Sequence, residues 1–198
     1  MRYKVMKLHI EDLLSLEDYD SQRDTIKKDL INHKKDRTIN VGENIVLIFE
    51  DSKTIKYQVQ EMLRIEKIFN KKEIQEEIDA YNPLIPDGTN LKATMLIMYP
   101  DVQVRKEMLF KLHDIENNIW ITVGDNKITA FADEDLERST DDKTSAVHFL
   151  RFQFGQTEIT EFLSGAEVKV GVTHPEYQEI INIEGSVRKS LEQDFKSS

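Results

Sequence analysis

The sequence contains no cysteine, and this absence excludes several kinds of chemistry. Disulfide bridges, thiolate nucleophiles, cysteine-ligated iron–sulfur clusters and cysteine-based zinc sites all need a sulfur atom that this chain lacks. The first ten residues are too polar for a secretory signal, and no apolar run approaches the roughly 20 residues of a membrane helix. We therefore expect a protein of a reducing compartment, the cytoplasm, with no membrane segment.

Glycine and proline are also scarce, with seven and four residues among 198. No linker, repeat or low-complexity tract divides the chain, so its loops are expected to be short or charged. Hydrophobic residues make up 39% of the sequence and include nine Phe and six Tyr, which is enough for one buried core. The sequence predicts a single globular domain over residues 1–198, in which a helical segment at 1–40 packs on the core.

The formal net charge of −10 argues against a nucleic-acid partner. Proteins that bind nucleic acids through phosphate groups need a basic surface, and an acidic surface repels polyanions. The one basic cluster, at residues 33–37, is typical of a solvated helix end whose cations complement the helix dipole. We expect no nucleic acid among the partners of this protein.

The spacing of apolar residues predicts an α+β fold. Runs rich in β-branched and aromatic residues predict five or six strands, largely antiparallel in one mixed sheet that helices cover. The expected strands are 44–49, 93–98, 119–123, 127–132, 146–154 and 166–172, with a hairpin turn at 124–126. The expected helices begin near Ser15, Ser21, Thr54, Glu73, Asp101, Thr157 and Gly185. The helix from Thr54 is expected to have an apolar stripe of Ile55, Val59, Met62 and Phe69 on its inner side. The helix from Asp101 is expected to have one of Val104, Met108, Leu112 and Ile115.

Familiar catalytic and cofactor motifs are absent from the sequence. It has no glycine-rich phosphate loop, dinucleotide fingerprint, His-Glu-x-x-His pair or nucleophile elbow, and so no nucleotide cofactor motif. Candidate sites are therefore polar residues at positions that favour apolar ones. Glu66 lies eleven residues after Ile55, about three helical turns, and is expected on the same apolar stripe. A carboxylate buried there would have to be paired, hydrogen-bonded, metal-bound or protonated.

The strand expected at 146–154 carries two more candidates. Alternation places His148 on one face with Leu150 and Phe152, and Arg151 on the other face with Phe149. Both faces are mainly apolar, so each polar side chain is a candidate for burial. His148 is either a hydrogen-bonded core histidine or, together with Glu66 and Arg151, part of a catalytic group.

A divalent metal site is a further possibility. Imidazole and carboxylate groups of His33, His148, His174 and Glu66 could supply its ligands, although no ligand spacing in the sequence requires a metal. Candidate binding residues are Glu61 and Arg64, which form a ladder on the helix from Thr54, and Tyr81, Asn82 and Asp87 in a proline-stiffened loop.

Four of these segments also carry a resemblance: Gln60–Glu66, Asp79–Gly88, Ala132–Arg138 and Ser145–Phe152. From about Leu8 to the C-terminal helix, the chain is similar to a bacterial family of uncharacterised proteins, domain of unknown function 3501. Members are often encoded beside rubrerythrin-like diiron proteins and an iron–sulfur oxidoreductase. The resemblance implies a redox or peroxide-stress setting and a redox protein as partner, and it transfers no catalytic residue.

Two functions from different classes remain open. The first is a non-catalytic accessory protein that binds a redox partner, in which Glu66, His148 and Arg151 form a buried structural network. The second is a metal-dependent or acid–base enzyme acting on a small anionic molecule, with Glu66 or Glu61 and His148 as ligand or general base and Arg64 or Arg151 holding the anionic group. The second predicts that these side chains converge on one pocket.

Overall fold

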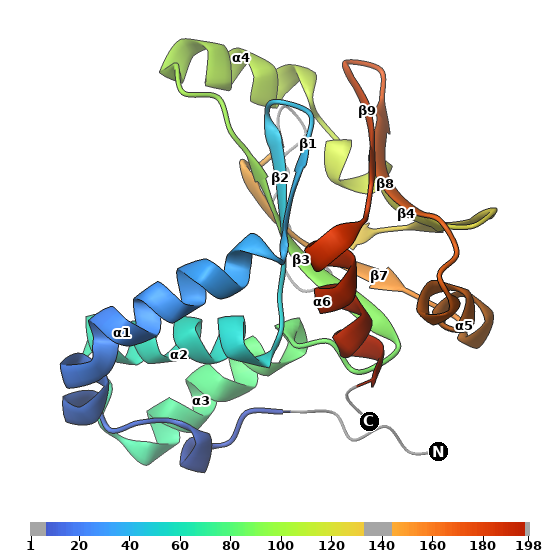
Figure 1. Cartoon of the computed structure of the whole chain (residues 1–198). Helices are drawn as coiled ribbons and strands as arrows, with labels where there is room; N and C mark the ends of the chain where they lie inside the picture. Colours follow the sequence, from blue (N-terminus) through green and yellow to red (C-terminus); the bar gives the residue numbers. More distant parts are fainter. Residues whose placement is uncertain (1–6, 133–143, 197–198) are drawn as a thin grey trace.

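The computed structural model describes residues 7–132 and 144–196, which form six α-helices, three short 3₁₀ helices and nine strands (Figure 1). In chain order the elements are η1 (Ile10–Asp12), α1 (Leu16–Lys35), β1 (Thr38–Val41), β2 (Ile45–Phe49), α2 (Ser52–Glu66), α3 (Lys71–Tyr81), η2 (Asn82–Leu84), β3 (Asn90–Ile97), α4 (Val102–Lys111), η3 (Ile115–Asn118), β4 (Ile119–Val123), β5 (Asn126–Thr129), β6 (Phe131–Ala132), β7 (Val147–Gln153), α5 (Gln156–Ser164), β8 (Val168–His174), β9 (Tyr177–Asn182) and α6 (Gly185–Lys196).

The strands form two antiparallel sheets, which confirms the predicted α+β class and strand direction. The larger sheet has the order β1-β2-β3-β7-β6 and the smaller one β5-β4-β8-β9. The described strands therefore outnumber the five or six expected in one sheet. β1 overlaps the end of the segment 1–40 that was predicted to be helical. Its four residues lie between the end of α1 and a turn at Gly42, and they pair with β2. β9 was also unexpected, since most of its residues are exposed and no apolar alternation marks it.

The main core fills the space between the two sheets. Alternate residues of β2, β3, β4, β7 and β8 point into it, including Leu47, Met95 and Val170, all of which are fully buried. Phe154, Phe162 and Phe195 close one end with edge-to-face contacts, with ring centroids 5.0–6.3 Å apart. Two of these rings come from α5 and α6, which explains why both amphipathic helices form where the sequence predicts them.

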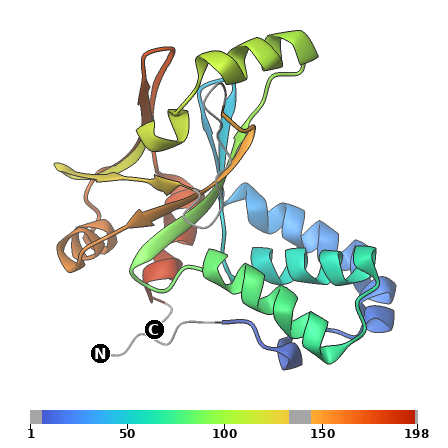
Figure 2. The ribbon, with the colours of Figure 1, turned by 180° about the vertical axis from the view of Figure 1, so that it is seen from behind.

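A separate group of helices, here called the helical lobe, consists of η1, α1, α2, α3 and η2. Figures 1 and 2 show it at one side of the sheets, with α1, α2 and α3 packed beside one another. It has its own apolar cluster, made of Leu8, Ile55, Val59, Leu63, Ile78 and Ile85. The lobe therefore folds around a second core instead of packing flat on a sheet.

Several helix predictions hold and three details change. The hydroxyl of Ser15 caps α1 by accepting a hydrogen bond from the Asp18 amide, as the spacing predicts. The expected second start at Ser21 is wrong, because α1 continues through it as one helix of 20 residues. Phe69 lies beyond the end of α2 and is 72% exposed, and Val104 on α4 is also exposed, so neither belongs to an inner stripe.

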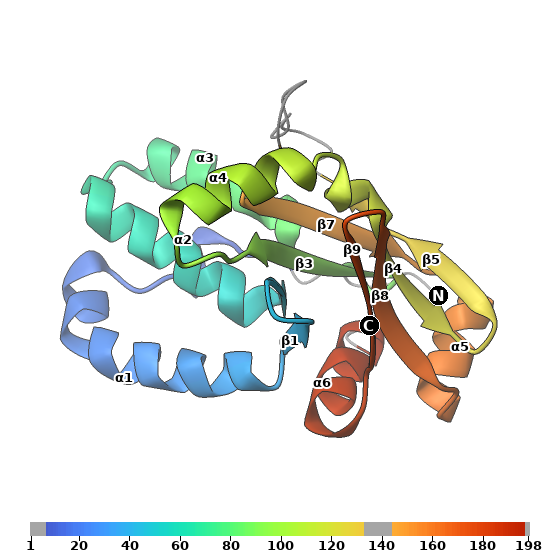
Figure 3. The same cartoon turned by 90° about the horizontal axis from the view of Figure 1, so that it is seen from above.

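Helix α4 spans one end of the sheets, as Figure 3 shows from above. None of its ten residues is fully buried, and only Met108 and Leu109 pack against the main core. Phe110 points away from the core and is 63% exposed. Within the described residues, no helix is both long and apolar enough to span a bilayer.

Candidate functional site

The structure places Glu66 on the surface, so the prediction of a buried carboxylate is wrong. Its position around the helix axis matches that of Ile55, but it is the last residue of α2, and Lys67 ends the helix in a left-handed conformation. Leu63, three residues earlier, is still buried in the apolar cluster of the lobe, but Glu66 is exposed. The carboxylate instead lies near Tyr81, whose pKa is raised mainly by burial and further by Glu77 and Glu66.

His148 is fully buried, as strand alternation predicts, and lies far from the helical lobe in the fold. Its Nε2 atom is 2.8 Å from the hydroxyl of Thr144 and 3.0 Å from the carbonyl of Ser145. The Thr144 hydroxyl donates to the carboxylate of Glu116 at 2.8 Å. With its proton on Nε2, His148 can donate to the hydroxyl oxygen of Thr144 and to the carbonyl of Ser145. The histidine is thus part of a hydrogen-bonded chain inside the core.

Arg151 extends from the opposite face of β7. Its guanidinium lies over the ring of Phe131, 4.5 Å from the centroid, and donates to Gln153 at 2.8 Å. Glu61 and Glu66 belong to α2 in the helical lobe, and Glu61 is held there by Tyr19, Arg23 and Arg64. The predicted convergence of Glu66, His148 and Arg151 on one pocket is therefore wrong.

The four candidate metal ligands are also separated. Nε2 of His33 lies 2.6 Å from Asp51, and His174 lies 3.0 Å from the carbonyl of His113 while its Nδ1 accepts the amide of Glu176. In the part of the chain that the structure describes, no three histidine or acidic side chains come close enough together to hold a metal ion. The predicted segment Ala132–Arg138 lies, from residue 133 on, outside the described residues.

Glu61 and Arg64 do meet, in a cluster between α1 and α2. Arg23 donates to both carboxylate oxygens of Glu61 at 2.8 Å, Tyr19 donates to one of them at 2.7 Å, and Arg64 is 3.3 Å away. The hydrogen bond from Arg23 is the main reason why the pKa of Glu61 falls to about 2, although burial opposes the shift. Burial and this carboxylate raise the pKa of Tyr19. The sequence pattern shows Glu61 and Arg64 as neighbours on one helix, and it cannot show the two partners from α1.

The loop candidates Asn82 and Asp87 form structural hydrogen bonds with the backbone and with a neighbouring side chain. The amide group of Asn82 exchanges two hydrogen bonds with the backbone of Leu8, at 2.8 and 3.1 Å. The carboxylate of Asp87 accepts from the amide and hydroxyl of Thr89, which fixes the turn before β3. Both polar side chains are thus engaged by the fold itself.

A buried ionic junction at Arg37 was not predicted from the sequence. Arg37 is 1% exposed and donates to the carbonyls of Phe49 and Glu50 and, at 2.6 Å, to Asp194 of α6. Its Nε is also 3.5 Å from Asp51, the N-cap of α2. Burial raises the pKa of Asp194 to about 6, and Arg37 opposes that shift. The one signal in the sequence is an aspartate beside Leu191 and Phe195 on the apolar side of the terminal helix.

Next to this junction, Glu50 is buried and forms no ion pair with any described residue. Its two carboxylate oxygens accept the hydroxyls of Thr54 and, at 2.6 Å, Thr94. These contacts link the first turn of α2 to β3. At 2% exposure the carboxylate is closed to a ligand, which makes it a structural group.

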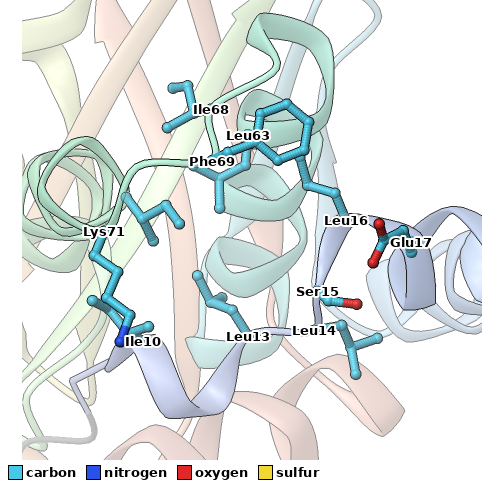
Figure 4. A pocket seen from close by; sticks show the side chains of 11 residues that line it. Ile10, Leu13, Leu14, Ser15, Leu16, Glu17, Leu63, Ile68, Phe69 and Lys71 are labelled. Atoms are coloured by element: carbon cyan, nitrogen blue, oxygen red, sulfur yellow. The ribbon is translucent and has the colours of Figure 1, made fainter.

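Two of the pockets in the described part of the chain lie in the helical lobe. The first, here called the apolar pocket, has a volume of about 300 Å³ and lies between η1, the start of α1, the end of α2 and the start of α3 (Figure 4). It is lined by Ile10, Leu13, Leu14, Ser15, Leu16, Glu17, Leu63, Ile68, Phe69, Lys71 and Ile74. Figure 4 shows Lys71 and Glu17 on opposite sides of an opening whose other labelled side chains are mostly aliphatic.

The second, here called the α1–α2 pocket, has a volume of about 330 Å³. It is lined by Leu14, Tyr19, Gln22, Ile26, Asp29, Leu30, Lys53, Lys56, Tyr57 and Gln60. Leu14 is common to both pockets, so the segment that precedes α1 forms a wall between them. Neither pocket can be recognised in the sequence, because neither is formed by a single motif.

Comparison with known proteins places the chain in a family and gives no activity. A crystal structure of a novel protein of unknown function from Burkholderia pseudomallei K96243 is similar over 96% of this chain and 99% of its own, with 45% sequence identity and a TM-score of 0.90. No curated protein matches significantly. The model of the family described as "Protein of unknown function (DUF3501)" matches residues 7–195. The chain belongs to this family.

Proposed function

We propose that this protein is a non-catalytic accessory protein that binds a partner protein through the apolar pocket of its helical lobe. The observation that carries the proposal is the position of Phe69, which lines the mouth of this pocket and is 72% exposed. An exposed aromatic ring beside a cavity with aliphatic walls is typical of a protein-binding surface, because covering it removes apolar area from water.

The lining indicates the chemistry of the partner segment. Ile10, Leu13, Leu63 and Ile74 form aliphatic walls that suit one or two large apolar side chains. Lys71 and Glu17 on opposite sides of the opening complement an acidic and a basic residue that flank those anchors. An amphipathic helix with apolar residues at i and i+4 presents this arrangement.

The state of the charged clusters favours binding over catalysis. Glu61 is occupied by Tyr19, Arg23 and Arg64, and its low pKa makes it a poor base at neutral pH. The second function, a metal-dependent or acid–base enzyme acting on a small anionic molecule, would require such a group to face a substrate. No observation on the described residues favours it.

The family resemblance supplies the setting of the proposal. A rubrerythrin-like diiron protein and an iron–sulfur oxidoreductase are the first partners to test, in the cytoplasm and under peroxide stress. An electron-transfer partner fits a chain with no cysteine of its own, because the redox centre would lie entirely in the other protein.

Site-specific photo-cross-linking tests the proposal in cells that express the protein. A photoreactive phenylalanine analogue replaces Phe69 in one variant and Phe110 in a second, matched variant. Both rings are exposed, but Phe69 lines the apolar pocket and Phe110 is not among its lining residues. We expect position 69 to yield a discrete adduct with one protein, identified by mass spectrometry, and position 110 to yield none with that protein.

Binding of the purified partner then measures the contribution of the ring. We expect Phe69→Asp to weaken the affinity at least tenfold, which corresponds to about 1.4 kcal/mol, and Phe110→Asp to change it less than twofold. Equal effects of the two substitutions, or an adduct at position 110 alone, would refute the assignment of the apolar pocket.

A further inference from the structure

The α1–α2 pocket has a different chemical character from the apolar pocket. One wall is formed by Leu14 and by one face of α1, where Ile26 and the buried Leu30 are the main apolar side chains. The facing wall is a polar stripe of α2, made of Lys53, Lys56, Tyr57 and Gln60. These four positions have i, i+3, i+4 and i+7 spacing, so they lie along one side of the helix.

The cations on this wall lack acidic partners. Among the described residues neither Lys53 nor Lys56 forms an ion pair, whereas Arg23 and Arg64 are both paired with Glu61. Asp29 on α1 is the one carboxylate that lines the pocket, so the lining carries two cations against one anion. Lys53 lies in the first turn of α2, where the helix dipole also favours a negative charge. This local positive charge contrasts with the net charge of −10 of the whole chain.

One hydroxyl in the pocket is available to a ligand. Tyr19 is already committed to Glu61, and the side chain of Gln60 bonds to the backbone of Leu14 at both its oxygen and its nitrogen. No described residue forms a hydrogen bond with the hydroxyl of Tyr57. Burial raises the pKa of Tyr57, so this hydroxyl stays protonated at neutral pH and can donate.

We propose that the α1–α2 pocket binds a small amphipathic carboxylate, whose apolar body lies against Ile26 and Leu30 and whose carboxylate group meets Lys53, Lys56 and the hydroxyl of Tyr57. A volume of about 330 Å³ has room for roughly ten non-hydrogen atoms, at the ~30 Å³ that a water molecule takes in the liquid. This is the size of a medium-chain fatty acid or a short aromatic acid. The inference does not depend on the partner-binding function, since it concerns the other pocket.

Binding of octanoate to the whole protein tests the inference. Isothermal titration calorimetry and methyl NMR are carried out with octanoate, 1-octanol and octyltrimethylammonium, which share the same alkyl chain. We expect octanoate to bind saturably at one site and to shift the methyl signals of Leu14, Ile26 and Leu30. Octanol should bind at least tenfold more weakly, and the cationic amphiphile should not bind at this site.

Two double variants separate the charge of the pocket from the charge of the chain. Lys53→Gln/Lys56→Gln removes the pocket cations and should weaken octanoate binding at least tenfold. Lys27→Gln/Lys28→Gln removes two exposed cations of α1 that do not line the pocket, and it should leave the affinity within twofold. Near-UV circular dichroism confirms that both variants are folded.

Three outcomes would overturn the inference. These are the absence of saturable octanoate binding, an affinity that the Lys53→Gln/Lys56→Gln variant retains, and binding of octanol or the cationic amphiphile as tight as that of octanoate. The last would show an apolar cavity without preference for a carboxylate. None of these results bears on cross-linking at position 69, so the two proposals can fail separately.

Discussion

Replacement of Arg37 by methionine should be among the most destabilising single substitutions in this protein. The side chain is 1% exposed and connects β1 with the end of β2, the cap of α2 and the terminal helix α6. Methionine has a similar length and packs well, so the substitution removes the charge and the hydrogen bonds more than the volume.

The magnitude follows from what the substitution leaves behind. Asp194 is 8% exposed and loses the cation 2.6 Å away, while the carbonyls of Phe49 and Glu50 lose side-chain donors. Removing one partner of a buried ion pair costs about 3–5 kcal/mol, because the other charge stays buried. We expect the free energy of unfolding to fall by about 4 kcal/mol at neutral pH, a large part of the ~5–15 kcal/mol typical of a domain.

Urea unfolding followed by far-UV circular dichroism measures this loss, with Lys28→Met on the exposed face of α1 as the control. The control should stay within about 0.5 kcal/mol of the wild type. The double variant Arg37→Met/Asp194→Leu should recover most of the loss, since an apolar pair of similar volume replaces the ion pair. Unchanged m-values would show that the comparison concerns stability and not a change in the unfolded state.

The loss should also depend on pH, with a sign set by Asp194. Its folded pKa, about 6, is raised above the ordinary 3.8, so protonation favours the folded state and this contribution to stability declines as pH rises through 6. Without Arg37 the pKa rises further. The cost of Arg37→Met should therefore shrink as pH falls from neutral toward about 6, because the lone carboxyl of the variant becomes neutral at a higher pH than the paired carboxyl of the wild type. A cost under about 1 kcal/mol, no recovery in the double variant, or a cost that grows with acidity would refute the reasoning.

Three other predictions follow from single contacts. Glu61→Gln should lower the free energy of unfolding by roughly 2 kcal/mol at neutral pH. The fall of the pKa from 4.5 to about 2 sets an upper bound of about 3 kcal/mol, which partial exposure of the carboxylate reduces. In urea titrations, the wild type should lose this stability as pH falls from about 4.5 to 2, and the variant should not. Gly171→Ala should destabilise by about 1–3 kcal/mol and change the fluorescence of Trp120, because a Cβ at residue 171 would lie 2.3 Å from the indole ring; an unchanged spectrum and midpoint would contradict the packing. Ser15→Ala removes the N-cap of α1 and should lower the thermal midpoint by an amount equivalent to about 1 kcal/mol, whereas Ser21→Ala, inside the helix, should have a smaller effect.

The parts of the fold that the sequence reveals are those in which a local pattern and the tertiary environment agree. β7 alternates between a buried face with His148 and a half-buried face with Arg151, and the period of two in its sequence is enough to show it. The hairpin between β4 and β5 lies where the sequence indicates it, although its turn consists of Gly124 and Asp125 alone, because Asn126 already pairs with Val123. The sequence does not predict β1 and β9, because an edge strand needs no strong apolar pattern of its own. Each forms its hydrogen-bond ladder with one neighbouring strand, β2 and β8 respectively.

Helical periodicity misleads at the ends of α2 for a physical reason. A stripe is a direction around the helix axis, and Glu66 does share the direction of Ile55. Burial also needs a neighbour at that height along the axis: Leu63 packs in the apolar cluster of the lobe, whereas Glu66, the last residue of the helix, is exposed. Phe69 lies in the connection beyond this helix end, where helical spacing no longer applies, and it is exposed at the apolar pocket.

Binding surfaces and ionic junctions of this chain are products of segments far apart in sequence. Arg37 meets Asp194 across 157 positions, and Arg23 meets Glu61 across 38. A single sequence shows each of these residues only beside its neighbours along the chain. Because Arg37 follows Lys34 and Lys35, it has the pattern of a solvated helix end. Both pairs join elements that are separate in the sequence, since Arg23 and Glu61 connect α1 with α2, and Arg37 and Asp194 connect the start of β1 with α6. The apolar pocket and the α1–α2 pocket likewise combine side chains from several elements, so neither can be read from one segment of the chain.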